Sequence, residues 1–267
     1  MLILNCTKAA ADFFSVTKQG KKITPLEPAP QQTIAESSNL PDWQWIIHAI
    51  KVKSKHVIVA MDYQSRFSIT LSGMKKGDDS AYLDNLEHHL GAHIREMMES
   101  IGIDPQTIED SLTRYFESHS KRAIYQRSDR SVQTHINDVV WHFRHSIHEE
   151  MSSIPTGIEL LGFDTSVNQL FRIRKIDKDY FTPQYEFLHA WLTRYCFYTS
   201  EQVDGCIEKY KAKQWAEVNA RYMASTHLDA NDVINLLNNY GGLNDKNLNI
   251  EQSNDNVVSL EAYRKNK

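Results

Sequence analysis

The hydrophobic period of the chain changes from two residues to 3.6 between Gly73 and Gly77, and this change limits the folds open to it. Before it, residues 43–74 hold three short apolar runs rich in β-branched side chains, with turns between them at 53–55 and 63–66. Short alternating runs joined by tight turns are typical of strands that pair with their sequence neighbours. The segment therefore predicts a three-stranded antiparallel β-meander.

The third run alternates clearly, because Phe67, Ile69 and Leu71 are separated by Ser68 and Thr70. We expect the three apolar residues to face the core and the two hydroxyl residues to point outward.

After Gly77 an apolar stripe follows helical spacing from Leu83 to Ile101. Asp104 and Pro105 then predict the start of another helix, which runs to about Phe116, since aspartate caps a first turn and proline needs no N–H there.

The N-terminal segment combines a short strand signal with a capping residue. Leu2–Leu4 is apolar, and Thr7 can cap a short helix that reaches Phe14. Residues 15–41 contain four of the seven prolines and predict a long, partly extended loop.

The second half of the chain is mainly helical in character. Residues 158–176 are mixed, with a strand-like alternation at 169–173. Thr182-Pro183 predicts another helix start, and Thr199 with Gln202 forms a capping box for a long helix to about Met223. A last helix is expected after Asp229, ending at Gly241-Gly242.

These elements predict an α+β fold, in which helices pack on a small antiparallel meander and a mainly α-helical second half follows. The expected organisation is an α+β domain over residues 1–152, a mainly helical region over 153–242 that can pack on it, and a disordered tail over 243–267, which is rich in Asn, Asp and Lys.

Composition points to a soluble protein of the reduced cytoplasm. The 267 residues carry a net charge of −4, and no apolar stretch is long enough to span a bilayer. The first residues lack the cationic region of a signal peptide. Three cysteines with no CxxC pair favour neither a disulfide framework nor a thiolate zinc site. We therefore expect a cytoplasmic location and no membrane partner.

The segment from Tyr125 to Met151 gathers the most candidate chemistry and is expected to form one helix. Its apolar side chains fall on one face, and the opposite face carries Asp138, His142, His145 and Glu149. Carboxylates and imidazoles at this spacing can bind a divalent metal and activate water. The alternative is a solvent-facing polar stripe on an amphipathic helix.

Two segments resemble a bacterial domain family that is itself of unknown function, over roughly residues 1–150. They are the opening MLILNCTK and the stretch RSDRSVQTHINDVVWHF, in which Asp129-Arg130-Ser131-Val132 and Asn137-Asp138 match the family pattern. A strand meander introduced by a tryptophan, here Trp45, is a further similarity. The resemblance implies the fold and a bacterial origin, and no activity. The family has a small residue where His135 stands, so a catalytic role for His135 would not be a family property.

Arg130 and His135 also resemble the R-x4-6-H motif of small helical ribonucleases of the HEPN type. That resemblance implies that Arg130 binds the scissile phosphate and His135 exchanges a proton, without metal and across two protomers. Neighbouring residues would give a local basic surface for nucleic acid, namely Arg114, Tyr115, Lys121, Arg122, Tyr125 and Arg127. The alternative is that Asp129 caps the helix and Arg130 makes a structural ion pair.

No strong catalytic motif accompanies these sites. The chain has no GxxxxGK[ST], GxGxxG, GxSxG or DxDxDG pattern, and it nominates no cofactor. Aromatic residues are frequent in the second half, and an exposed group of them would suit a protein partner or a second copy of the chain. The sequence therefore favours a non-catalytic, partner-binding or regulatory protein, with the ribonuclease and the metal-dependent hydrolase as alternatives.

Overall fold

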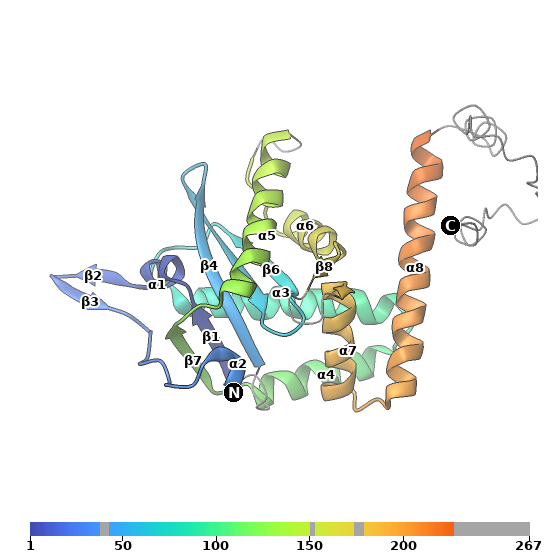
Figure 1. Ribbon diagram of the computed structural model, residues 1–267, viewed down its shortest axis with the longest axis horizontal. Helices are drawn as coiled ribbons and strands as arrows, with labels where there is room; N and C mark the ends of the chain where they lie inside the picture. The colour runs from blue at the N-terminus through green and yellow to red at the C-terminus, as the bar shows by residue number, and fades with distance from the viewer. Residues whose placement is uncertain (38–42, 150–152, 174–178, 227–267) are drawn as a thin grey trace, which may run out of the picture. The chain divides into compact units, whose positions relative to one another are not determined.

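The computed structural model describes residues 1–37, 43–149, 153–173 and 179–226 (Figure 1). Contacts divide the chain into two units, Met1–Lys211 and Ala212–Lys267. The strands are β1 (Leu2–Cys6), β2 (Val16–Lys18), β3 (Lys21–Ile23), β4 (Trp43–Val52), β5 (Lys55–Asp62), β6 (Ser68–Ser72), β7 (Arg122–Gln126), β8 (Arg172–Ile173) and β9 (Tyr180–Phe181). The helices are α1 (Lys8–Phe14), α2 (Ile34–Ser37), α3 (Asp79–Ser100), α4 (Pro105–Ser118), α5 (Arg130–Glu149), α6 (Ile158–Asn168), α7 (Pro183–Tyr195) and α8 (Ser200–Thr226).

The central sheet has five strands in the order β6-β5-β4-β1-β7. The β4-β5-β6 part is the predicted antiparallel meander, so the expected α+β class is confirmed. The sequence did not predict that β1 lies between β4 and β7 and runs parallel to both, with Leu4 beside Trp45 and Ile124. The predicted strand at Leu2–Leu4 is thus in the interior of the sheet.

The predicted helix starts are confirmed where a side chain caps its own first turn. Thr7 Oγ1 accepts a hydrogen bond from the Ala10 N–H at 3.4 Å. Asp104 Oδ1 accepts one from the Thr107 N–H at 2.9 Å. At the start of α8 the Thr199 N–H donates to Gln202 Oε1 at 2.9 Å, and the Gln202 N–H donates to Thr199 Oγ1 at 3.4 Å. Each bond satisfies an N–H that has no partner inside the helix.

Helices cover both faces of the sheet, with α5 across one face and α3 behind the other (Figure 1). The α3 face holds an aromatic core in which Trp43 and Trp45 of β4 meet Phe187 of α7. On the α5 face, Ile46 lies in one cluster with Phe143. Alternate residues of β4 thus enter different cores, as the pleat requires.

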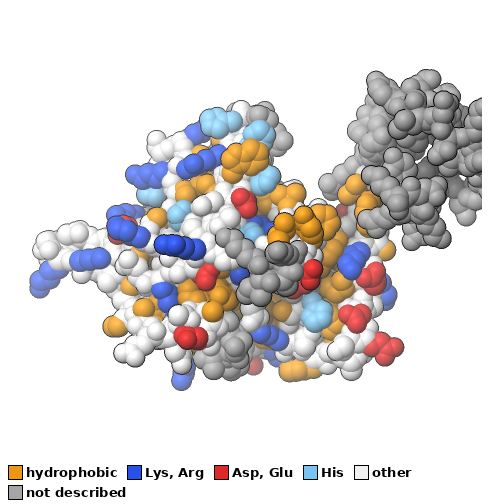
Figure 2. Space-filling model, in the orientation of Figure 1, with side chains coloured by type: hydrophobic (Ala, Val, Ile, Leu, Met, Phe, Trp, Pro, Cys, Tyr) orange, Lys and Arg blue, Asp and Glu red, His pale blue; other side chains and the backbone are white. Residues whose placement is uncertain are grey.

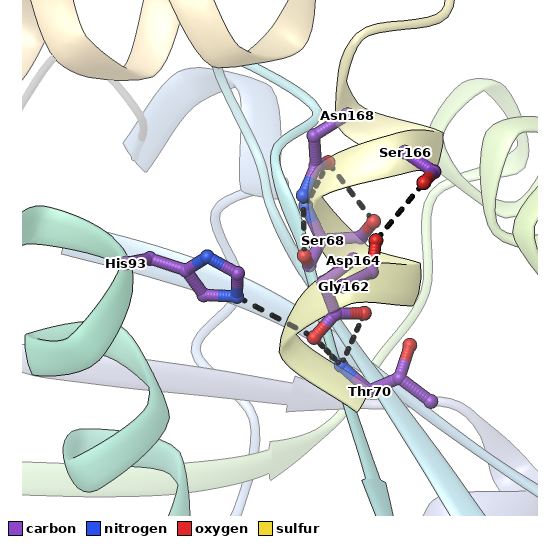
Figure 3. A network of polar contacts seen from close by, with 7 residues as sticks. All are labelled: Ser68, Thr70, His93, Gly162, Asp164, Ser166 and Asn168. Carbon is purple, nitrogen blue, oxygen red and sulfur yellow. Dashed lines mark hydrogen bonds and ion pairs between the residues drawn. The ribbon is translucent and has the colours of Figure 1, made fainter. Parts of the chain in front are cut away.

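The free edge of β6 is closed by side chains of α6 (Figure 3). Asn168 Oδ1 accepts from the Ser68 N–H at 2.8 Å, and Asn168 Nδ2 donates to the Ser68 carbonyl at 2.8 Å, as a neighbouring strand would. One turn earlier, Asp164 accepts from the Thr70 N–H at 2.9 Å. An uncovered edge strand is a template for unwanted pairing, and α6 removes it.

This closure corrects the expectation for Ser68 and Thr70. Both residues point away from the aromatic core as expected, but both are fully buried, because α6 covers them. His93 of α3 reaches the same place, with its Nε2 3.6 Å from Asp164 Oδ2. Burial raises the pKa of Asp164, while the nearby His93 and the Thr70 N–H act in the opposite direction.

Three sequence expectations are wrong in their boundaries. The helix expected from Tyr125 begins at Arg130, because 122–126 form strand β7. The loop expected over 15–41 contains the β2–β3 hairpin and α2, and the mixed stretch after 158 begins with the helix α6. The expected helix after Asp229 and the tail over 243–267 lie outside the described residues. The domain boundary near 152 stays a prediction. No helix in the described ranges is long and apolar enough to cross a membrane.

Candidate functional site

The two family-like segments meet in a buried polar network beside β1 and β4. Arg127, which follows β7, donates from Nε to Asn5 Oδ1 and from Nη1 to the Gln32 carbonyl at 3.0 Å. Asn5 Nδ2 in turn donates to Gln44 Oε1 at 3.2 Å. Asn5 and Gln44 are buried, so the network satisfies polar groups that water cannot reach. Asn5 and Arg127 therefore join the sheet to the loop that contains Gln32.

Asp129 caps α5, as the alternative reading of this segment expected. Its Oδ1 accepts from the Ser131 N–H at 2.8 Å and from the Val132 N–H at 3.1 Å. Its Oδ2 accepts from the hydroxyl of Tyr63 at 3.5 Å, which ties the helix start to the β5–β6 turn.

Replacing Asp129 with alanine is expected to lower the free energy of unfolding by about 1 kcal/mol, since two N–H groups lose their cap. Asp129→Asn should retain most of that stability, because asparagine caps nearly as well. Urea unfolding followed by circular dichroism measures both. An asparagine variant as unstable as the alanine variant would show that the cap is not what Asp129 contributes.

Arg130 and His135 lie on different sides of α5. Residues five apart on an α-helix are separated by about 140° around its axis. The Arg130 side chain is exposed, whereas the His135 side chain is largely buried, with its Nδ1 4.0 Å from Asp138 Oδ2. Within one chain the two side chains do not converge, so a ribonuclease site would need a second copy. That hypothesis stays a prediction from the sequence.

The predicted metal stripe is an open helix surface. Asp138 is 63% exposed, and the rings of His142 and His145 lie 4.9 and 5.0 Å from the ring of Trp141. Burial lowers the pKa of His142, and Asp138 opposes this. Where side chains are described, no group of three His, Cys, Asp or Glu residues is arranged to hold a metal ion. The side chain of Glu149 is outside that description, so the metal site also stays a prediction.

Most side chains of the basic surface expected around residues 114–130 make contacts within the protein. Tyr115 is in the aromatic core and cannot stack on a base. Arg114 Nη1 donates to the Tyr195 carbonyl at 2.6 Å, and Arg122 Nη2 lies 2.5 Å from Glu87 Oε1. Arg127 belongs to the network described above. Most of these charges are thus committed to contacts within the fold.

The polar recess near the start of β4 is also held together by its own side chains. Its lining consists of Trp43, Gln44, Asp62, Tyr63, Gln64, Ala190 and Arg194. The Arg194 guanidinium lies 5.1 Å from the centre of the Trp43 ring and donates to Gln64 Oε1 at 3.3 Å. Asp62 Oδ2 accepts from the Ser65 N–H and hydroxyl, both at 2.7 Å. Burial raises the pKa of Asp62, and the Ser65 donors oppose this. Asp62 therefore stabilises its own turn.

Arg172 is a buried charge that the sequence did not single out, although it stands between the apolar Phe171 and Ile173. Its Nη1 donates to the His135 carbonyl at 3.2 Å, which joins β8 to α5. Burial lowers the pKa of Arg172 to about 10, with Asp138 raising it and Arg66 lowering it further. A charge held in this position fixes the short β8–β9 hairpin against the central helix.

Four large apolar side chains on and beside this hairpin remain in solvent. Leu170 is 43% exposed, Phe171 76%, Ile173 44% and Tyr180 72%. Ile173 and Tyr180 are register partners in the β8–β9 ladder, so the strand pairing sets their spacing. We call these four residues the hairpin patch. Of the aromatic residues expected to offer a binding surface, Phe181, Trp191 and Tyr195 are buried in the fold instead.

Comparisons with known proteins agree with the sequence resemblance. No curated protein and no solved structure gives a significant match. The family model for "Domain of unknown function (DUF6933)" matches residues 3–186. The match reaches beyond the roughly 150 residues that carry the resemblance and ends within α7. It covers the five-stranded sheet, the closing helix α6 and the hairpin patch. The chain belongs to the family described as Domain of unknown function (DUF6933).

Proposed function

We propose that this protein acts by binding another protein through the hairpin patch. The observation that carries the proposal is the exposure of Leu170, Phe171, Ile173 and Tyr180 within one short segment. Contiguous exposed apolar side chains are uncommon on soluble monomers and mark interaction sites. Aromatic residues of this kind often contribute much of the binding free energy at protein interfaces.

The attachment of the patch to the fold supports the same proposal. The buried Arg172 holds β8 to the His135 carbonyl of α5. Phe181 of β9 is buried, whereas its neighbour Tyr180 is exposed, as expected for a strand with one face inward. A surface that is already ordered loses little conformational entropy when a partner binds. Hydrophobic side chains, drawn in orange, gather in Figure 2 where Figure 1 places α6 and β8.

A double substitution tests the proposal. Phe171→Ser with Tyr180→Ser should reduce recovery of the bound protein at least about tenfold in affinity capture from cells. The matched control is Ile23→Ser with Phe197→Ser, which removes two exposed apolar side chains from other segments. Both variants should unfold within about 0.5 kcal/mol of the wild type, because surface substitutions of this kind have small effects.

The comparison has two contradicting outcomes. The proposal is wrong if no protein is recovered with the wild type above the level of the affinity tag alone. It is equally wrong if the patch variant and the control variant recover the same proteins in the same amounts.

A further inference from the structure

Three strands, β1, β4 and β6, terminate at the same end of the sheet, and lysines lie at or just after each C-terminus. β1 is parallel to β4, and β4 is parallel to β6 because β5 pairs antiparallel with both. Their C-terminal ends therefore lie together. The residues there, with those of the β2–β3 hairpin, include nine exposed lysines, which we call the lysine edge: Lys8, Lys18, Lys21, Lys22, Lys51, Lys53, Lys55, Lys75 and Lys76.

Backbone contacts hold these segments side by side. The Gly77 N–H donates to the Phe13 carbonyl of α1 at 3.0 Å, and the Gly73 N–H donates to the His56 carbonyl of β5 at 3.2 Å. Gly77 also lies directly against Val16 of β2, where a Cβ atom would clash. The loop after β6 thus contacts α1, β2 and the β4–β5 hairpin. The lysines of four separate segments form one surface.

Few carboxylates neutralise this surface. Lys8 Nζ lies 2.9 Å from Asp12 Oδ2, and this contact lowers the pKa of Asp12, with smaller contributions from Lys22 and Lys76. Asp78 and Asp79 lie nearby, and Asp78 already caps α3. Burial lowers the pKa of His56, and Lys51 and Lys76 lower it further. Lysines of two segments thus lie close enough to His56 to disfavour its charged form.

A surface with many lysines and few carboxylates favours a ligand that carries many phosphates. We propose that the lysine edge binds the phosphate backbone of a nucleic-acid duplex. The charged groups are lysines at hairpin ends, which approach phosphates as point charges. The β2–β3 hairpin projects from the sheet in Figure 1, and blue side chains surround it in Figure 2. A two-stranded ribbon of this kind fits the major groove of DNA.

Other polyanions fit this surface less well. Single-stranded nucleic acid is bound largely by stacking on aromatic rings, and the aromatic residues of α1, Phe13 and Phe14, are buried. A membrane surface is bound by basic residues together with apolar anchors. Among the described residues beside these lysines, Ile23 of β3 is the large apolar residue that is exposed, with 50% of its surface accessible. The lysine edge thus offers positive charge, with few exposed aromatic or apolar side chains beside it.

Fluorescence anisotropy with 20-base-pair DNA and RNA duplexes tests the proposal with the full chain. We expect a Kd in the range of about 1–100 μM near physiological salt, as is usual for sequence-independent binding, and tighter binding at lower salt. Lys18→Gln, Lys21→Gln and Lys22→Gln together should weaken binding at least about tenfold. The slope of log K against log salt for the DNA duplex should become less steep by about 3, close to one unit for each lost phosphate contact.

The matched control is Lys121→Gln, Lys209→Gln and Lys213→Gln, which removes the same charge from exposed lysines outside the lysine edge, one before β7 and two within α8. This variant should bind like the wild type. The proposal fails if the wild type binds neither duplex at low salt, or if both triple variants weaken binding equally. It also fails if polyglutamate, single-stranded DNA or vesicles with anionic lipids bind as tightly as the duplexes.

Discussion

Asn168→Ala is expected to lower the free energy of unfolding by about 3 to 5 kcal/mol, because it removes three hydrogen bonds from buried groups. The Ser68 N–H and hydroxyl both donate to Asn168 Oδ1, at 2.8 and 3.1 Å, and the Ser68 carbonyl accepts from Asn168 Nδ2. All of these groups are excluded from water, so none regains a partner when the amide is lost. Urea unfolding followed by tryptophan fluorescence measures the change.

Ser166→Ala is the control for this prediction, since Ser166 is on the exposed side of the same helix and bonds only to Gly162 within α6 (Figure 3). It should alter stability by less than about 0.5 kcal/mol. Equal stability of the Asn168 and Ser166 variants would contradict the role assigned to α6.

Trp191→Ala is expected to lower the free energy of unfolding by about 3 to 5 kcal/mol, as for other large aromatic residues in cores. Trp191 is fully buried, and its ring lies 5.0 Å from that of Tyr115 and 4.7 Å from that of Tyr195. Its Nε1 donates to Ser111 Oγ at 3.0 Å, so the substitution also leaves a buried hydroxyl without its donor.

Trp141→Ala provides the matched control, because Trp141 is 60% exposed on α5. Its loss should cost less than about 1 kcal/mol, mainly through its stacking on His145. Thermal unfolding of the two variants measures the difference. If Trp191→Ala were no more destabilising than Trp141→Ala, α7 would not contribute to the aromatic core as described.

The features that the sequence predicted are those encoded within a few residues. The caps at Thr7 and Asp104 each join a side chain to an N–H three residues later, and the Thr199–Gln202 box works in the same way. The meander was predictable because its strands follow one another through short turns. In all these cases, local chemistry and tertiary structure select the same conformation.

The features that the sequence did not predict depend on distant partners. β7 pairs with β1 across more than a hundred residues, and no short pattern in RAIYQ identifies that partner. The helix α6 was missed because its buried face carries the polar Asp164 and Asn168 and its exposed start carries Ile158, so its apolar residues do not form one stripe. Its Asp164 and Asn168 resemble loop residues in the sequence and become intelligible only against the β6 edge.

The candidate sites show the same distinction. Helical geometry placed Asp138, His142 and His145 opposite the apolar face of α5, where Asp138 and His145 are exposed and His142 is partly buried. It could not reveal that Arg172 of β8, 27 to 34 positions away in the chain, lies buried against α5. The exposed aromatic group was expected in the second half, but which of its members would be buried depended on the core formed with β4.

Site-specific photo-crosslinking from the hairpin patch tests the central claim most directly. The photoreactive analogue p-benzoylphenylalanine in place of Phe171 should, after irradiation in cells, join the chain to one other protein. The same analogue in place of Phe197, which is equally exposed but follows α7, should give no such product. Absence of a crosslink from position 171, or the same product from both positions, would contradict the claim that the hairpin patch is the binding surface.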